Sequence, residues 1–94
     1  MTTLHIEHPI NDFKIWKAAF DRFAEFRAKA GVRGHRLQHL IDDPRFMIID
    51  LEFDNAGGAE KFLAFLRSNV WAQPENSPGL AGRPIARIFQ DVAQ

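Results

Sequence analysis

The order in which the hydrophobic period changes along this 94-residue chain limits the folds open to it. Apolar residues alternate over residues 2–8, recur at helical spacing over 12–30, and alternate again over 32–41 and 46–53. They return to helical spacing after residue 55 and alternate once more over 85–92. A period of two indicates a strand and a period of 3.6 indicates a helix. The chain is therefore predicted to run strand, helix, strand, strand, helix, strand.

This βαββαβ order is the split βαβ arrangement of ferredoxin-like folds, so we expect a single α+β domain over residues 1–94. Right-handed crossovers would place both helices on one face of a four-stranded antiparallel sheet, with the first and third strands in its centre. The first helix has an apolar half and a charged half, and Arg27 is the only charged residue on the apolar half. We expect the stem of Arg27 to pack there while its head reaches water.

The open face, meaning the sheet side chains directed away from the helices, is predicted to mix charged and apolar residues. Its apolar members would be Phe46, Ile48, Ile85 and Phe89, which left bare would form an exposed patch. A two-fold dimer that closes two such faces on each other would cover that patch. The nine Phe and two Trp are also hard to hide in one small chain. We therefore expect a homodimer.

Several segments lie in a familiar order: 8–13 (HPINDF), 16–20 (WKAAF), 31–34 (GVRG), and 42–44 (DDP) followed by 48–53 (IIDLEF). Together they resemble the dimeric α/β-barrel superfamily of ferredoxin-like proteins, which includes antibiotic biosynthesis monooxygenase-like and stress-responsive barrel proteins. The resemblance implies a barrel built by two subunits. The Asn/Trp/His pattern of its cofactor-free oxygenases and the His pattern of its haem-degrading members cannot be placed here, which counts against those activities.

A group of charged residues is predicted on the open face. Antiparallel pairing of the first and third strands would bring His5 and Glu7 near Asp50 and Glu52, with Arg87 on the adjacent last strand. Grouped carboxylates raise one another's pKa, and such clusters in clefts are candidate functional sites. The cluster is expected to be a self-satisfied charge network in the dimer, or a site with His5 or Asp50 as catalytic base and the other three as ligand-binding residues. A metal site there is a third interpretation, which no metal motif supports.

Aromatic residues suggest a second place for a ligand. Trp16, Phe20, Phe65 and Trp71 could line an apolar pocket beside the sheet, although aromatics at helical spacing are also typical of a core. Residues 68–84 carry three of the five prolines and are too long for a plain connection, so we expect a lid or a partner-contacting arm. His8, before Pro9, is expected at the surface of a strand end.

Composition excludes several classes of protein. The absence of cysteine rules out disulfides, Cys-ligated zinc and a thiol nucleophile. Twelve basic against twelve acidic residues argue against binding nucleic acid or an anionic membrane. No spanning segment or signal sequence is evident, so we expect a cytoplasmic protein.

The expected function is a homodimer that binds a small molecule in a pocket beside the sheet, with no cofactor and no metal. The alternative, which the resemblance suggests, is a cofactor-independent monooxygenase or isomerase acting on a small aromatic or polyketide-like substrate. A purely structural dimer without a pocket is also consistent with the sequence. The sequence does not decide whether the protein is an enzyme.

Overall fold

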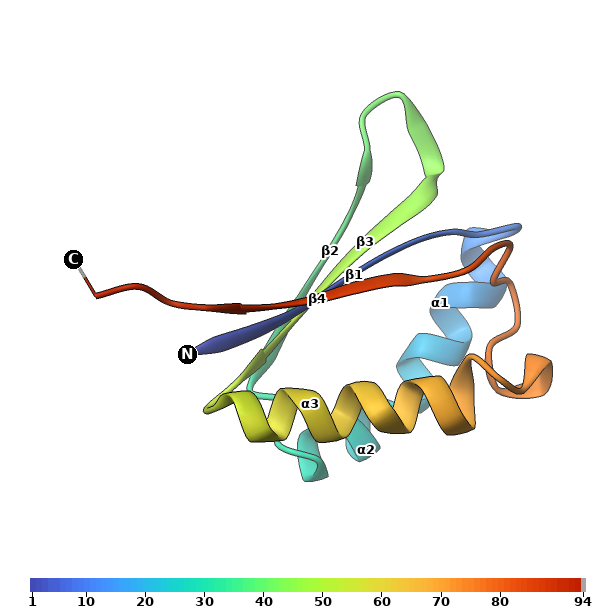
Figure 1. Ribbon diagram of the computed structural model, residues 1–94. Coiled ribbons are helices and arrows are strands. Elements are labelled where there is room, and N and C mark those ends of the chain that lie inside the picture. The colour runs from blue at the N-terminus through green and yellow to red at the C-terminus, as the bar shows by residue number, and fades with distance from the viewer. Residues whose placement is uncertain (94) are drawn as a thin grey trace.

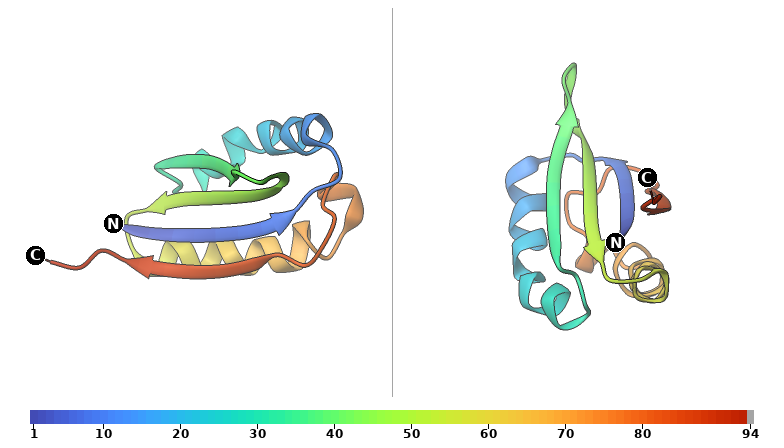
Figure 2. Two further views of the ribbon diagram at one scale, coloured as in Figure 1. Left: turned by 90° about the horizontal axis from the view of Figure 1, so that it is seen from above. Right: turned by 90° about the vertical axis from the view of Figure 1, so that its left-hand side faces the viewer.

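The computed structural model describes residues 1–93 and confirms the α+β fold and its predicted topology. Four antiparallel strands form one sheet in the order β2-β3-β1-β4, so the first and third strands are central. The helices cover one face of this sheet (Figures 1 and 2). The elements are β1 (Thr2–Pro9), α1 (Phe13–Arg22), α2 (Ala24–Lys29), β2 (Gly34–Leu40), β3 (Asp43–Phe53), α3 (Ala56–Phe65), the π-helix η1 (Leu66–Val70), the 3₁₀ helix η2 (Pro74–Asn76) and β4 (Ile85–Gln90).

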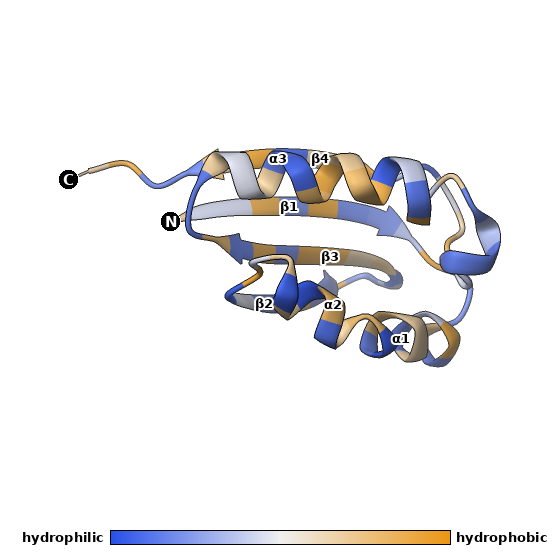
Figure 3. Ribbon diagram, turned by 90° about the horizontal axis from the view of Figure 1, so that it is seen from below, coloured by the Kyte–Doolittle hydropathy of each residue, from blue (hydrophilic) through white to orange (hydrophobic). Residues whose placement is uncertain are grey.

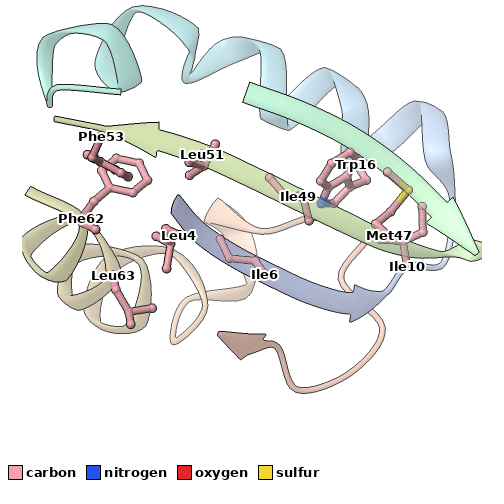
Figure 4. Close-up of a cluster of buried hydrophobic side chains, with 11 residues drawn as sticks. Leu4, Ile6, Ile10, Trp16, Met47, Ile49, Leu51, Phe53, Phe62 and Leu63 are labelled. Atoms are coloured by element: carbon pink, nitrogen blue, oxygen red, sulfur yellow. The ribbon is translucent and has the colours of Figure 1, made fainter. Parts of the chain in front are cut away.

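Strand β1 separates the two faces of the sheet. Its residues are buried and half-buried in strict alternation, as a strand with one covered face requires. Leu4 lies opposite Leu51 and Ile6 opposite Ile49, and all four point toward the helices. They belong to a core whose larger members are shown in Figure 4: Leu4, Ile6, Ile10, Trp16, Met47, Ile49, Leu51, Phe53, Phe62 and Leu63.

The helix predicted over residues 12–30 is broken in two at Phe23. Its start is capped as expected, because the Asp12 side chain accepts a hydrogen bond from the Ile15 amide at 3.0 Å. At the break the Phe20 carbonyl accepts from the Phe23 amide at 3.3 Å and from Arg27 Nη1 at 2.6 Å. The Arg27 side chain thus satisfies a carbonyl that the end of α1 leaves free.

Other boundaries also differ from the sequence prediction. Strand β3 begins at Asp43, inside the predicted turn, and the β2–β3 hairpin extends past the rest of the sheet (Figure 1). Strand β4 ends at Gln90, two residues before the predicted end of the alternating pattern, and Val92 is 82% exposed. Helix α3 lies beside β1 and β4 and α1–α2 lie beside β2 and β3, so two groups of helices cover different halves of the same face of the sheet (Figure 3).

Residues 71–84 form an arm that docks on the end of β1. The Asn11 amide donates to the Gly79 carbonyl at 2.7 Å, and the Ala81 amide donates to the Pro9 carbonyl at 3.1 Å. Gly79 has a φ of +87°, a conformation that favours glycine. The arm therefore packs against its own chain, and the two roles expected for this segment, a lid and a partner-contacting arm, stay predictions.

Candidate functional site

An apolar pocket of about 100 Å³ lies between the helices and the covered face of the sheet. The sheet, the helices and the arm all contribute its walls. The sheet supplies Ile6, His8, Ile49 and Leu51, and the α1–α2 segment supplies Trp16, Ala19, Phe20, Phe23, Phe26 and Arg27. The α3–η1 segment and the arm supply Phe62, Phe65, Leu66, Val70, Trp71, Asn76, Ser77, Pro78 and Leu80. All four aromatics predicted for a pocket, Trp16, Phe20, Phe65 and Trp71, lie on this wall.

Aromatic contacts hold these walls in place. Trp16 stacks on Phe20 with ring centroids 5.3 Å apart and planes 24° apart. Across the pocket, Phe26 of α2 meets Phe65 of α3 at 4.6 Å. Such pairs are stabilising beyond the area they bury. Trp16 is also only 8% exposed and belongs to the core, so its core and pocket interpretations both apply.

His8 was expected at the surface of a strand end, and this expectation is wrong: the residue lines the pocket. It is 4% exposed and its ring meets Trp16 edge-on at 5.8 Å. Nδ1 donates to the Pro9 carbonyl at 3.1 Å, and within residues 1–93 Nε2 has no hydrogen-bond partner. Burial lowers the pKa of His8, against the opposing effect of its backbone hydrogen bonds, so a neutral ring offers an Nε2 lone pair. The alternation of the strand could have indicated this position, because His8 follows Leu4 and Ile6 at a spacing of two and therefore shares the covered face with them.

Arg27 also differs from expectation, because its head was expected to reach water. The residue as a whole is only 7% exposed, so Arg27 does not extend into bulk water as expected. The guanidinium carbon lies 3.6 Å from the centroid of the Phe20 ring, and Nη1 donates to the Phe20 carbonyl. Burial lowers the pKa of Arg27, and the charge of Asp21 acts in the opposite direction. The group nevertheless remains a cation at neutral pH.

The other polar residues on the wall are engaged within the arm. Asn76 Nδ2 donates to the Asn69 carbonyl at 2.7 Å and to Gln73 Oε1 at 3.1 Å. The Ser77 hydroxyl donates to the Gln73 carbonyl at 3.4 Å. In the described part of the chain, His8 and Arg27 are therefore the polar pocket groups with the most unused hydrogen-bonding capacity.

Three members of the charged cluster predicted on the open face are in contact. His5 Nδ1 lies 2.6 Å from Asp50 Oδ1, and Nε2 lies 2.8 Å from Glu7 Oε2. Burial alone would lower the pKa of His5, but the hydrogen bonds and charges of Glu7 and Asp50 outweigh it and raise the pKa. A ring with a carboxylate at each nitrogen is a double donor. His5 in this state holds a proton and has no lone pair with which to act as a base.

The rest of the open-face cluster is less tightly joined. Asp50 is 8% exposed, and its second oxygen lies 3.4 Å from Arg36 Nη2. Glu52 accepts from the Thr3 hydroxyl at 3.3 Å. Arg87 pairs with His5 in the strand register but is exposed, and it makes no ion pair within residues 1–93. In the same part of the chain, no group of three acidic or histidine residues is arranged to hold a metal ion.

The pocket and the charged cluster lie on opposite faces of the sheet. His5 and Asp50 therefore cannot act as a base on a molecule held in the aromatic pocket. Successive side chains of a strand point to opposite faces, so His5 and Asp50 face away from the side where Ile6 and Ile49 line the pocket. Glu7, Glu52 and Arg87 likewise lie outside the pocket wall.

Several solved structures share this fold. A candidate antibiotic biosynthesis monooxygenase from Bordetella bronchiseptica is 14% identical and superposes with a TM-score of 0.73 over 98% of each chain. Another from Nitrosomonas europaea is 13% identical, with a TM-score of 0.67 over 99% of this chain and 100% of that one. A dimeric ferredoxin-like protein from an uncultured marine organism is 10% identical, with a TM-score of 0.64 over 100% of this chain and 97% of that one.

At these identities the likeness establishes the fold: the chain has the ferredoxin-like fold shared by monooxygenase-like and dimeric ferredoxin-like proteins. The sequence matches no protein-family model and no curated protein. None of the helices in the described residues combines the length and apolar character needed to cross a membrane.

Proposed function

We propose that this protein is a homodimer in which each subunit binds one small, mostly apolar molecule in the pocket between the helices and the sheet. The pocket carries the proposal. Its aromatic walls come from the α1–α2 segment and from the α3–η1 segment, and the arm closes one side of the pocket. Concave, mostly apolar sites with a few polar groups are the usual form of small-molecule sites. The cytoplasm remains the expected location on the sequence grounds given above.

The volume of the pocket suggests the size of its ligand. The cavity measures about 100 Å³, whereas drug-sized ligands occupy pockets of roughly 300–1,000 Å³. An engineered apolar cavity of about 150 Å³ is known to take up benzene. A molecule with a single ring, or an aliphatic molecule of similar size, is therefore the proposed ligand.

The alternative of a cofactor-independent monooxygenase or isomerase has weaker support. His5 and Asp50, the bases it would need, lie across the sheet from the pocket, and both His5 nitrogens contact carboxylates. As catalytic residues they would require a separate site on the open face, with Glu7, Glu52 and Arg87 beside them. We therefore prefer binding as the proposed function and a charge network as the role of this cluster.

The open face is the proposed dimer interface. Ile85 and Phe89 are 54% and 49% exposed there, and Phe46 and Ile48 are only half-buried. A patch of this kind on a small chain is typical of an interaction surface. Two solved structures with the same fold are described as dimeric ferredoxin-like proteins. In such a dimer, the His5 network would be enclosed between two sheets and would fix how they pair.

Ligand binding can be followed by intrinsic fluorescence. The chain has no tyrosine, and its two tryptophans, Trp16 and Trp71, both lie on the pocket wall. Titration with single-ring aromatic probes should change their emission with saturation, and calorimetry should give the same affinity. Val70→Phe, which fills the pocket, should abolish the response, whereas Asn69→Phe at the exposed neighbouring position should not. Absence of a saturable response in the unmodified protein would overturn the proposal.

The dimer is tested by sedimentation at micromolar concentration. The protein should sediment at about twice the 10.8 kDa of one chain. Ile48→Asp, which would bury an unpaired charge in the interface, should give a folded monomer by circular dichroism. Ile15→Asp makes the same change on α1, where Ile15 is 52% exposed, and should leave the dimer intact. An unmodified chain that sediments as a monomer contradicts the proposed interface.

A further inference from the structure

Arg27 is the one buried charge that lacks an oppositely charged partner in the described residues. Asp50, a buried acidic residue, contacts both His5 and Arg36. Although Arg27 is only 7% exposed as a residue, it makes no ion pair within residues 1–93. Burying an unpaired charge is strongly unfavourable, so proteins normally pair such groups.

The guanidinium has hydrogen-bonding capacity to spare. It carries five N–H donors, and only the bond from Nη1 to the Phe20 carbonyl is formed among the described residues. No buried side-chain nitrogen or oxygen in the described residues lacks a hydrogen-bond partner, so the unused donors of Arg27 are not sealed within the core. Arg27 lines the pocket together with aromatic residues such as Phe23 and Phe26.

We propose that the ligand of this pocket is a small apolar molecule bearing a single carboxylate, and that Arg27 pairs with that carboxylate. This inference rests on the proposed function, since it assumes that the pocket is occupied. One guanidinium neutralises one negative charge, which favours a carboxylate over a doubly charged phosphate monoester. The planar fork of an arginine also matches a carboxylate in a two-point contact.

The ring of the ligand would lie against the aromatic wall of Trp16 and Phe20, which also supports the guanidinium. His8 adds a second element of specificity. Its neutral Nε2 lone pair can accept a hydrogen bond from a hydroxyl or amide on the ligand, and it would repel a second carboxylate. The pocket therefore distinguishes a monocarboxylate from a dicarboxylate as well as from a neutral molecule.

A purely structural role for Arg27 is the competing explanation. Its bond to the Phe20 carbonyl holds the break between α1 and α2, and this alone would retain an arginine. The two roles differ in one measurable property. A structural arginine affects stability without affecting which ligand charge is preferred, whereas a ligand-pairing arginine determines that preference.

The test compares benzoate with benzamide, which are similar in size and planarity but differ in charge. Their affinities would be measured by calorimetry and tryptophan fluorescence for the unmodified protein, Arg27→Gln, Arg27→Lys and the exposed control Arg67→Gln. Because a hydrogen bond to a charged group contributes about 1.5–3 kcal/mol, benzoate should bind the unmodified protein at least about tenfold more tightly than benzamide.

Arg27→Gln keeps an N–H donor but no charge, so the benzoate preference should fall to about one while benzamide still binds. Arg27→Lys should keep most of the preference, and Arg67→Gln should keep all of it. Equal binding of the two probes to the unmodified protein would overturn the inference and leave the proposed function standing. So would a preference that survives Arg27→Gln. Failure of both probes to bind the unmodified protein would remove the proposed function itself.

Discussion

Replacing Gly79 with alanine is expected to destabilise the arm over the pocket. Gly79 has a φ of +87°, and a Cβ placed there would lie 3.1 Å from the backbone nitrogen and 3.1 Å from the Cβ of Trp16. All three nearest atoms, including the Trp16 Cα at 3.2 Å, are fixed by the Trp16 backbone, which belongs to the first turns of α1. The arm would therefore have to shift away from the helix.

The magnitude follows from these two effects. A residue with a Cβ in a left-handed conformation costs roughly 1–2 kcal/mol, and overpacking a tight contact costs about 1 kcal/mol or more. Together they predict a loss of about 2–3 kcal/mol in the free energy of unfolding. For a domain of this size, each 1 kcal/mol corresponds to about 4–8 °C, so Tm should fall by roughly 10–20 °C.

The assays are thermal unfolding and amide hydrogen exchange. The Asn11 amide bonds to the Gly79 carbonyl at 2.7 Å, so its exchange should accelerate more than that of amides in the β1–β3 ladder. Gly57→Ala is the matched control: its Cβ would meet only Asn55 Oδ1, at 3.4 Å, inside a helix. That variant should gain up to about 1 kcal/mol. A Gly79→Ala protein with unchanged Tm and unchanged Asn11 protection would refute the reasoning.

Three further predictions concern titration and helix capping. The pKa of His8 is lowered from its ordinary 6.5, so the free energy of unfolding should decrease as pH falls from 6.5 through the folded pKa of His8. Urea titrations at several pH values should show that His8→Asn flattens this dependence of the free energy of unfolding on pH. The pKa of His5 is raised, so its contribution to the free energy of unfolding should be complete below pH 6.5 and lost as pH rises through its folded pKa. His5→Gln should remove this loss of stability with rising pH. A pH dependence unchanged by the substitution would contradict the assigned network. Asp12→Ala should cost about 1 kcal/mol through loss of the α1 cap, whereas Asn11→Ala, which removes no capping contact, should change urea stability by less than about 0.5 kcal/mol.

The assignment of residues to sheet faces could be predicted because alternation is a local property of a strand. Alternation placed Leu4 and Ile49 on the covered face and placed His5 opposite Asp50 on the neighbouring strand. The same rule applied to His8 would have placed it in the pocket. The presence of Pro9 obscured this, but β1 includes Pro9, whose carbonyl accepts from the Ala81 amide.

Features that depend on distant contacts were beyond the sequence. The apolar pattern of the first helix continues through Phe23, and the break becomes explicable only when Arg27 is seen to bond the Phe20 carbonyl. The position of the pocket depends on where the arm docks. That docking rests on the bond between Asn11 and Gly79, two residues far apart in the chain.

A substitution in strand β1 acts on one face of the sheet, whereas a change in the length of the strand acts on both faces. His8 and Ile6 face the pocket while Glu7 and His5 face the opposite side, so inserting one residue early in the strand would exchange these environments. Glu7 would be buried beside Trp16, and Ile6 would leave the core. A substitution on either face alters one property of the protein, whereas a single-residue insertion or deletion alters the core, the pocket and the charged cluster together.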